Sequence, residues 1–277
     1  MTSLSITPIT ENIGAEVTGA DLSRPADAAT REALNRALAD YSLLVIRDQK
    51  LDAAGFMQAS SVFGPSMPQH YSQFNMPDFP DIGILSSRDS DRRPDGSYIL
   101  RGTECWHTDH TNRERPPKAT ILYAISLPSK GGDTSFASMR AAYAALPEED
   151  KRRFAGMKTV NRLDRHNTAR EEDKAKYDVG IVHPLIRIHP DNATKALYFH
   201  PTKTERIVGM EPEESLALID ALLEKIIRPE IVYRHRWRLG DLVVCDNRAA
   251  LHRAHADYDP AEGRLLYRII VEGDRPV

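Results

Sequence analysis

The sequence is poor in cysteine and has no long apolar run. Its 277 residues include two cysteines, Cys105 and Cys245, which form no C-x-x-C pair. We therefore expect two small buried thiols rather than a disulfide framework, and a reducing, cytoplasmic location. The apolar stretches fall far short of the ~20 residues that a membrane span needs. Residues 1–7 lack the basic and apolar regions of a signal peptide, so neither a membrane anchor nor secretion is expected.

An excess of positive charge is also missing. The 37 basic residues are balanced by 40 acidic ones, for a net charge of −3, and no basic stripe stands out. This charge balance argues against nucleic acid as a partner. With 41% hydrophobic residues, the chain can build one large core or two small ones. We expect residues 1–277 to form a single domain, since no repeat or low-complexity tract divides them.

The first third of the chain predicts a mixture of helices and strands. Residues 5–9 and 41–47 have strand character, although Pro8 restricts the first of them to a sheet edge. Between them, Leu34, Leu38 and Tyr41 share one helical face, and a second short helix is expected over residues 53–63. Residues 64–102 are rich in Pro, Asp, Ser and Arg and predict a long irregular stretch.

The rest of the chain predicts mainly strands. The expected strands span residues 119–127, 183–189, 195–200, 230–237, 242–245 and 265–271. Pro212 begins one clear helix with an apolar stripe, so helices over 27–63 and 211–227 would flank the strands. Many short strands suggest an antiparallel sandwich or barrel, and a jelly roll would protect most strand edges. The charged segment 164–180 is either an active-site lid or a plain surface loop.

The spacing His-x-Asp occurs three times and is the first chemical signal. On a strand, a histidine and an aspartate two residues apart face the same side and can reach one ion. His189-Pro190-Asp191 and His255-Ala256-Asp257 lie in turn-like surroundings, whereas His107-Thr108-Asp109 precedes a strongly apolar strand. Two histidines and one carboxylate on one face of an octahedral ion leave three positions open, which suits iron(II) oxygen chemistry.

Several blocks in register resemble one enzyme family. They are Trp106-His107-Thr108-Asp109, then Gly131-Gly132-Asp133-Thr134, then Asp246-Asn247-Arg248 followed by His252, Arg264 and Arg268. Residues 14–17, 183–190 and 206–209 fit the same pattern. Together the blocks resemble the taurine and 2,4-dichlorophenoxyacetate dioxygenase (TauD/TfdA) family over nearly the whole chain. The resemblance implies a double-stranded β-helix, the jelly roll of the clavaminate synthase-like type.

The resemblance also implies a role for particular residues. His107, Asp109 and His252 match the family's iron(II) ligands, and Thr134 and Arg264 match the contacts to 2-oxoglutarate. His255 is a rival to His252, but its distances from the Asp246 block and from Arg264 fit the pattern less well. Arg264 suits its role physically, because a guanidinium can bind a carboxylate through two parallel hydrogen bonds.

For the substrate, the resemblance points to Arg268 and, through a gapped alignment, to His70 and Tyr71. Three positions depart from the taurine enzymes: Thr103 replaces an asparagine, His110 a small apolar residue and Lys203 a phenylalanine. These departures argue against taurine itself. Arg268, Lys203, His110 and His200 would together form an electropositive pocket for an anion. For Lys203 and His200, a plain solvent-facing position is an equally open alternative.

The sequence thus predicts a 2-oxoglutarate-dependent dioxygenase. Using iron(II) and O2, it would hydroxylate a C–H bond of a small anionic substrate, such as a sulfonate, sulfate ester or aryloxy acid. The products would include succinate and CO2. The alternatives are a zinc hydrolase or lyase with the same three ligands and a non-catalytic jelly-roll binding module, and the pair Thr134 and Arg264 argues against both. Neither the substrate nor the oligomeric state is fixed, and a homo-oligomer remains open.

Overall fold

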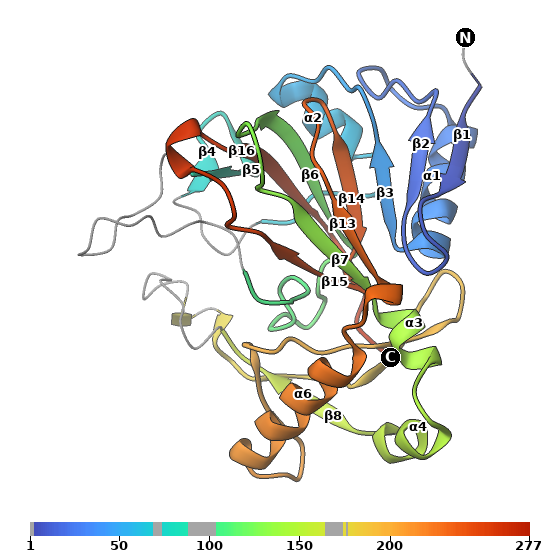
Figure 1. Ribbon diagram of the computed structural model, residues 1–277, viewed down its shortest axis with the longest axis vertical. Helices are drawn as coiled ribbons and strands as arrows, with labels where there is room; N and C mark the ends of the chain where they lie inside the picture. Colours follow the sequence, from blue (N-terminus) through green and yellow to red (C-terminus); the bar gives the residue numbers. More distant parts are fainter. Residues whose placement is uncertain (1–2, 69–73, 88–103, 164–173, 176) are drawn as a thin grey trace.

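The computed structural model describes residues 3–68, 74–87, 104–163, 174–175 and 177–277 (Figure 1). Within this part of the chain, the largest sheet has eight strands in the order β1-β2-β3-β14-β6-β16-β5-β4. Neighbouring strands are antiparallel except for the parallel pair β2 and β3. The strands are β1 (Ser5–Pro8), β2 (Ala15–Thr18), β3 (Leu43–Ile46), β4 (Asn75–Met76), β5 (Phe79–Ser86), β6 (Ala119–Ser126), β14 (Leu242–Asp246) and β16 (Leu265–Val271).

A smaller antiparallel sheet packs against the inner face of the large one. In it, β7 (Thr134–Ser138) lies between β13 (Val232–His235) and β15 (Ala250–Ala254). Phe136 of β7 and Ala250 of β15 belong to one buried cluster with Val45, Val243 and Cys245 of the large sheet. The two sheets therefore enclose a shared apolar core, as a double-stranded β-helix requires.

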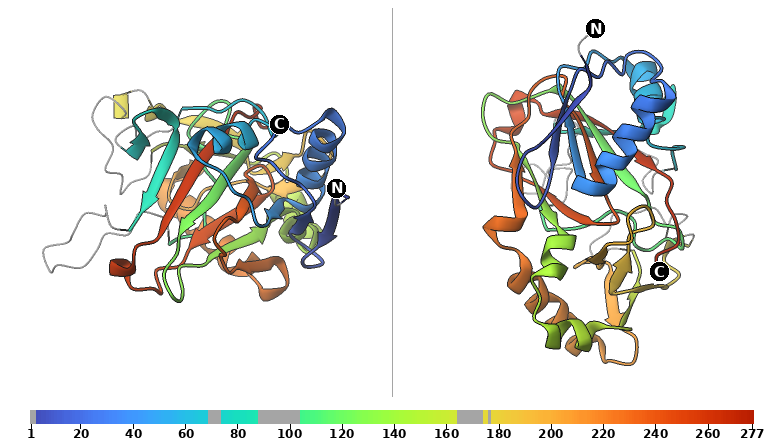
Figure 2. Two further views of the ribbon diagram at one scale, coloured as in Figure 1. Left: turned by 90° about the horizontal axis from the view of Figure 1, so that it is seen from above. Right: turned by 90° about the vertical axis from the view of Figure 1, so that its right-hand side faces the viewer.

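Two helices cover the outer face of the large sheet, and Figure 2 shows them together on that side. They are α1 (Ala28–Tyr41) and α2 (Ala53–Ser60). Each begins after an aspartate whose side chain accepts a hydrogen bond from a backbone N–H of the first turn, Asp27 from Thr30 and Asp52 from Gly55. Their buried side chains, including those of Leu38 and Phe56, join the main apolar cluster on this outer face.

The remaining elements lie in the lower part of the molecule in Figure 1, except for the 3₁₀ turn η3 (Pro260–Glu262), which lies beside the end of β5 at the upper left. They are the helices α3 (Met139–Ala144), α4 (Glu148–Phe154) and α6 (Pro212–Ile226), the 3₁₀ turns η2 (Pro229–Ile231) and η3, and the strands β8 (Lys158–Asn161), β9 (Ile181–Pro184), β10 (Ile186–Ile188), β11 (Lys195–Leu197) and β12 (Thr204–Ile207). The strands form two small sheets, β12-β8-β9 and β10-β11. Pro212 occupies the first turn of α6, and the buried Ile219, Leu222 and Ile226 hold this helix on the second apolar cluster.

Alternation along the central strands decides which side chains enter the space between the sheets. On β6, Ile121 and Tyr123 belong to the cluster on the helix side, whereas Leu122 lies in a separate inner cluster with Leu266 of β16. Successive side chains of a strand point to opposite faces. Thr120 on β6 and Arg268 on β16 therefore face the interior of the barrel.

The expected jelly roll with flanking helices is confirmed, but some expected elements were wrong. The segment 64–102 is not irregular throughout, because it contains β5, whose Pro80, Asp81 and Gly83 conceal its strand character in the sequence. The strand expected over 183–189 is split at Leu185 into β9 and β10. The helices α3 and α4 were not predicted. His107 and Asp109 were expected on a strand but lie outside any regular strand. Only a single β-bridge pairs His107 with His252.

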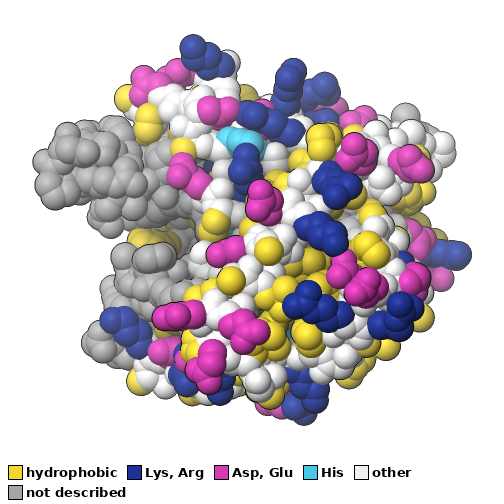
Figure 3. Space-filling model, turned by 60° about the horizontal axis from the view of Figure 1, so that its bottom comes forward, with side chains coloured by type: hydrophobic (Ala, Val, Ile, Leu, Met, Phe, Trp, Pro, Cys, Tyr) yellow, Lys and Arg dark blue, Asp and Glu magenta, His cyan; other side chains and the backbone are white. Residues whose placement is uncertain are grey.

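No helix in the described ranges is long and apolar enough to cross a membrane. Figure 3 shows basic and acidic side chains intermixed with apolar ones over the lower face of the molecule. Large regions of one charge sign are not seen on this face, so a charge preference for a ligand must come from local groups.

Candidate metal centre

His107 and His252 face each other across a single pair of backbone hydrogen bonds. The N–H of His107 donates to the carbonyl of His252 (2.9 Å), and the N–H of His252 donates to the carbonyl of His107 (2.7 Å). Directly opposed residues project their side chains to the same side, and the two ring centroids are 4.1 Å apart. Asp109 follows two residues later, with its Oδ1 3.9 Å from Nε2 of His107. One ligand atom from each of the three residues lies within 4.8 Å of the other two, and all three residues are buried.

The protonation states of these residues suit a divalent metal ion. Burial lowers the pKa of His107, and burial followed by the nearby His107 lowers the pKa of His252 to about 3. Burial by itself would raise the pKa of Asp109, but His252 and Arg268 outweigh it and hold this pKa well below its usual value. Two neutral imidazoles beside an ionised carboxylate form the state in which such side chains bind metal.

Two further contacts support the fit to a metal. The Nδ1 of His107 lies 3.0 Å from the carbonyl oxygen of Cys105. A carbonyl can only accept, so Nδ1 carries the proton and Nε2 keeps a free lone pair. The Nδ1 of His252 is buried without a hydrogen-bond partner, which is uncommon for a polar atom that has no further role. His255 is not part of this cluster, and its Nε2 lies 2.7 Å from the hydroxyl of Ser135.

Thr134 and Arg264 meet in a second buried group. The Nε of Arg264 donates to the carbonyl of Gly132 (2.8 Å), and its Nη2 donates to the hydroxyl of Thr134 (3.4 Å). The indole of Trp237 donates to the same hydroxyl (3.1 Å), and its ring lies 6.0 Å from the guanidinium carbon of Arg264. Arg264 is 6% exposed, and no described carboxylate forms an ion pair with it, since the nearby Asp133 and Asp257 both pair with Arg234. A buried cation without an anion is costly, so this group forms a candidate carboxylate site.

A tight glycine turn brings Thr134 to this position. Gly131 and Gly132 have φ angles of 73° and 70°, a conformation that glycine adopts without strain. A Cβ on Gly131 would lie 2.2 Å from the carbonyl oxygen of Asp257, and the side chain of Asp257 accepts from the N–H of Gly132 (3.0 Å). The turn is therefore packed against the protein itself, as expected of a structural turn rather than a phosphate loop.

The predicted substrate residues are only partly visible. His70, Tyr71 and Thr103 lie outside the described residues. Arg268 is half-buried and faces the barrel interior. His110 is buried directly after Asp109, with a φ of 48° that is uncommon for a residue with a side chain.

Lys203 and His200 belong to the turn that precedes β12. Burial, followed by the charge of Lys203, lowers the pKa of both His110 and His200. His200 is 2% exposed, and its ring lies 5.8 Å from that of His107, so the solvent-facing alternative for His200 is wrong. Lys203 is half-buried. Two positively charged side chains therefore act on the candidate metal centre, Arg268 from β16 and Lys203 from the turn before β12.

Three residues around the site were not predicted from the sequence. Trp237 contacts Thr134 and Arg264, as described above. Thr120 donates a short hydrogen bond to the carboxylate of Asp109, and the side chain of Asn247 donates to the hydroxyl of Thr120 (2.9 Å). Asn247 stood in the sequence as part of the Asp246-Asn247-Arg248 block, which served only to locate His252. Its position shortly before His252 in the sequence was the one signal that could have indicated a role at the site.

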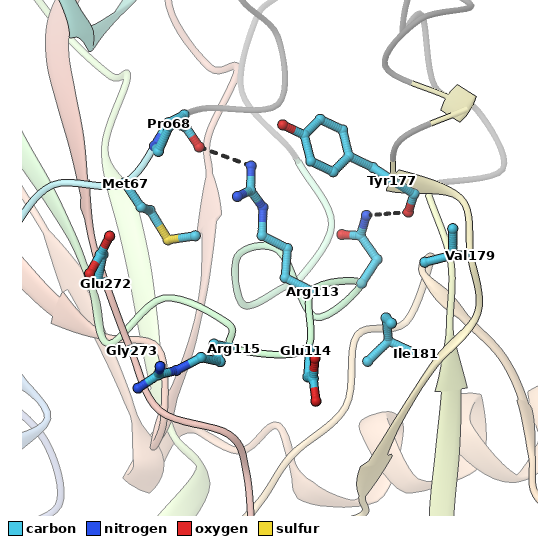
Figure 4. A pocket seen from close by; sticks show the side chains of 11 residues that line it. Met67, Pro68, Arg113, Glu114, Arg115, Tyr177, Val179, Ile181, Glu272 and Gly273 are labelled. Atoms are coloured by element: carbon cyan, nitrogen blue, oxygen red, sulfur yellow. Dashed lines mark hydrogen bonds between the residues drawn. The ribbon is translucent and has the colours of Figure 1, made fainter.

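A cavity of about 450 Å³ lies beside the turn that follows Asp109 (Figure 4). In it, Arg113 donates to the carbonyl of Pro68 (3.0 Å), and its guanidinium carbon lies 4.6 Å from the centre of the Tyr177 ring. Asn112 donates to the backbone carbonyl of Tyr177 (3.0 Å). The three metal-site residues do not line this cavity. These contacts instead hold the turn after Asp109 between two other segments of the chain.

Comparison with known proteins decides the family. Residues 5–270 match the family model described as "Taurine catabolism dioxygenase TauD, TfdA family". The chain belongs to this family. Its members are 2-oxoglutarate-dependent dioxygenases (2-oxoglutarate is also called alpha-ketoglutarate), so the enzyme class expected from the sequence is confirmed.

Individual relatives align with this chain over more than nine tenths of their own length. The chain is 32% identical to an (S)-phenoxypropionate/alpha-ketoglutarate-dioxygenase from Sphingobium herbicidovorans, with 98% of this chain and 96% of the relative covered. It is 31% identical to an alpha-ketoglutarate-dependent sulfate ester dioxygenase from Pseudomonas putida, with 99% and 91% covered. The crystal structure of AAD-2 in complex with Mn(II) and N-oxalylglycine aligns with a TM-score of 0.84 at 28% identity, covering 99% of each chain.

Proposed function

We propose that this chain uses iron(II), 2-oxoglutarate and O2 to hydroxylate a C–H bond of a small anionic substrate. The observation that carries the proposal is Arg264, a buried guanidinium that forms no ion pair with a described carboxylate. It lies beside Thr134 of β7, the strand that pairs with β15, which carries His252. A keto acid with a second carboxylate would bind the metal at one end and neutralise Arg264 at the other.

In this proposal, His107, Asp109 and His252 hold the metal ion. Iron(II) bound there would supply the oxygen chemistry that couples decarboxylation of 2-oxoglutarate, to succinate and CO2, with hydroxylation of the substrate. The protein contributes position and charge: Arg264 and Thr134 orient the keto acid. The AAD-2 structure supports binding of a metal ion together with a keto acid, because N-oxalylglycine is 2-oxoglutarate with an NH in place of one CH2 group.

We propose that Arg268 binds an acidic group of the substrate. It faces the barrel interior, and its charge acts on His107, Asp109 and His252. Lys203 and His110 would add to the attraction for an anion. The relatives support small anionic substrates, since their names specify phenoxypropionate and sulfate esters. His70, Tyr71 and Thr103 remain proposed substrate contacts on the grounds of the sequence alone.

We propose a reducing, cytoplasmic location and a single domain for the enzyme. Cys105 and Cys245 are both free thiols, which supports a reducing, cytoplasmic location. We propose that residues 1–277 act as one dioxygenase domain, because the site draws residues from β6, β7, β15 and β16.

An anaerobic titration tests the proposed function. Iron(II) and 2-oxoglutarate added together to the metal-free protein should produce a weak visible charge-transfer band, as expected of a keto acid chelated to iron(II). A zinc hydrolase or a binding module would show no such band. With oxygen admitted, a panel of sulfonates, sulfate esters and aryloxy acids should then be screened for succinate release. If the protein shows no such band and releases no succinate with any acid of the panel, the proposal is refuted.

A further inference from the structure

We infer that Thr120 and Asn247 are positioning residues for Asp109, fixing its carboxylate so that Oδ1 alone is offered to the metal. This inference rests on the proposed metal centre. Thr120 donates a short hydrogen bond to Oδ2 of Asp109, and Nδ2 of Asn247 donates to the hydroxyl of Thr120 (2.9 Å). Thr120 and Asn247 are each 1% exposed, so water does not compete for these bonds.

The direction of each hydrogen bond follows from the groups themselves. The backbone N–H of Asp109 can only donate, and it points to Oδ1 of Asn247 (3.3 Å). This contact fixes the amide orientation, so the Asn247 atom that faces Thr120 is the nitrogen. The amide nitrogen can only donate, and the Thr120 hydroxyl must accept from it. The single proton of that hydroxyl is then left for Oδ2 of Asp109.

Asn247 is itself held on two sides. The hydroxyl of Thr108 donates to the backbone carbonyl oxygen of Asn247 (2.8 Å). The backbone N–H of Asn247 donates to the carbonyl of Lys118 (2.9 Å). Thr108 directly precedes Asp109, and Lys118 directly precedes β6, which carries Thr120. Asn247 therefore joins the segment that carries the ligand to the large sheet. The chain Asn247, Thr120, Asp109 has little freedom to rearrange.

The consequence for the metal concerns the number of oxygens that Asp109 offers. Oδ2 is occupied by Thr120, whereas Oδ1 lies on the side of His107, 3.9 Å from its Nε2. A carboxylate that gives one oxygen leaves one more coordination position than a carboxylate that gives two. Groups that hydrogen-bond to a ligand typically change metal affinity by about 10–100-fold when they are removed.

Cobalt(II) binding tests this inference without turnover. Thr120→Val keeps the side-chain shape and removes the hydroxyl, Thr120→Ala is a second variant without it, and Thr120→Ser restores it. We expect Val and Ala to weaken cobalt(II) affinity by about 10–100-fold and to change its visible absorption spectrum. The Ser variant should stay within about threefold of the wild type and keep its spectrum.

The matched control is a buried threonine whose hydrogen bonds involve none of the three proposed metal ligands. Thr159 on β8 is also fully buried, and its hydroxyl also accepts from an asparagine amide, Nδ2 of Asn161 (3.0 Å). Thr159→Val should leave cobalt(II) affinity and spectrum unchanged while costing comparable thermal stability. The inference is overturned if Thr120→Val and Thr120→Ala bind cobalt(II) like the wild type. It is also overturned if Thr120→Ser or Thr159→Val loses as much cobalt(II) affinity as those two variants.

A separate comparison tests the metal centre on which the inference rests. His107→Ala should lose the cobalt(II) site altogether. If wild-type protein binds cobalt(II) no better than His107→Ala, the proposed metal centre fails, whatever Thr120 does. If the wild type binds and Thr120→Val binds equally well with the same spectrum, only the positioning role fails.

Discussion

Single residues decide the metal assignment, and the contrast between His252 and His255 is the sharpest case. His252 lies in the buried cluster with His107 and Asp109, whereas His255 contacts the hydroxyl of Ser135. Replacing His107, Asp109 or His252 by Ala should abolish iron-dependent succinate release, because each change removes a proposed ligand. His255→Ala, three residues from His252, is the matched control and should retain most of the activity. Loss in His255→Ala with full activity in His252→Ala would reverse the assignment.

Arg264 carries the co-substrate prediction. Removing one partner of a buried charge pair typically costs about 3–5 kcal/mol, so Arg264→Ala should raise the KM for 2-oxoglutarate by about a hundredfold or more. Arg264→Lys keeps the charge but loses the two-pronged hydrogen bonding, and should recover only part of the affinity. Initial rates at varied 2-oxoglutarate measure both effects. An unchanged KM in the Ala variant would place the carboxylate elsewhere, with Arg268 the first alternative.

Arg268 carries the substrate prediction. If it binds the substrate's acidic group, Arg268→Ala should weaken productive substrate binding by tens-fold or more, about 2 kcal/mol, while 2-oxoglutarate affinity changes little. Once a substrate is found, KM values for both compounds test this, together with turnover of an uncharged ester of the substrate. A purely structural Arg268 would instead lower the melting temperature, and the ester would then react as well as the acid.

The sequence predicted the residues that belong to recognisable motifs and missed those that act through tertiary contacts. The structure brings His107, Asp109 and His252 together as the spacing of the blocks suggested. Trp237 and Thr120 belong to no motif. Their roles depend on which strands become neighbours, and no local pattern in one sequence encodes that pairing.

Among the elements, the segment 164–180 was expected to be either a lid or a plain surface loop, and much of it lies outside the described residues. Its end is described: Tyr177 is buried and stacks on Arg113, four residues after Asp109. We expect hydrogen exchange over 164–176 to slow when metal, 2-oxoglutarate and substrate bind, because polar segments of this kind gain order mainly from ligands. Protection around Tyr177 should change less. Equal exchange with and without ligands would exclude a lid.

Elements with strong periodicity were predictable and those with mixed composition were not. The stripe of α6 and the apolar runs of β6, β14 and β16 all appear close to their expected bounds. By contrast, β7 carries Thr and Ser beside small residues, and β5 contains Pro and Gly. These strands are defined by their neighbours, β13 and β15 for β7 and β16 for β5, rather than by their own preferences.

For the molecule as a whole, function depends on closing the two sheets over a polar interior. The interior of the molecule contains buried histidines as well as apolar side chains. Burial is the largest cause of a lowered pKa for His107, His110, His183, His200, His235 and His252. An unfolded chain would protonate each of these imidazoles near pH 6.5.

This difference gives the stability of the metal-free protein a definite pH dependence. As the pH falls below about 6.5, the unfolded state binds protons that the folded state does not accept, so folding free energy is lost. The loss continues until the folded histidines titrate, which for His252 occurs at about 3. Each such imidazole contributes up to about 1.4 kcal/mol per pH unit over its window.

Urea unfolding of the metal-free protein should therefore show a falling midpoint already between pH 7 and 5.5. This range lies well above that in which unfolded carboxylates titrate, near 4, so the histidines rather than the aspartates must account for the early loss. His183→Asn removes one buried imidazole outside the metal site and should reduce the slope relative to the wild type. A midpoint that stays constant down to pH 5 and falls only below it would show that carboxylates dominate, and that the buried histidines are not kept neutral by the fold.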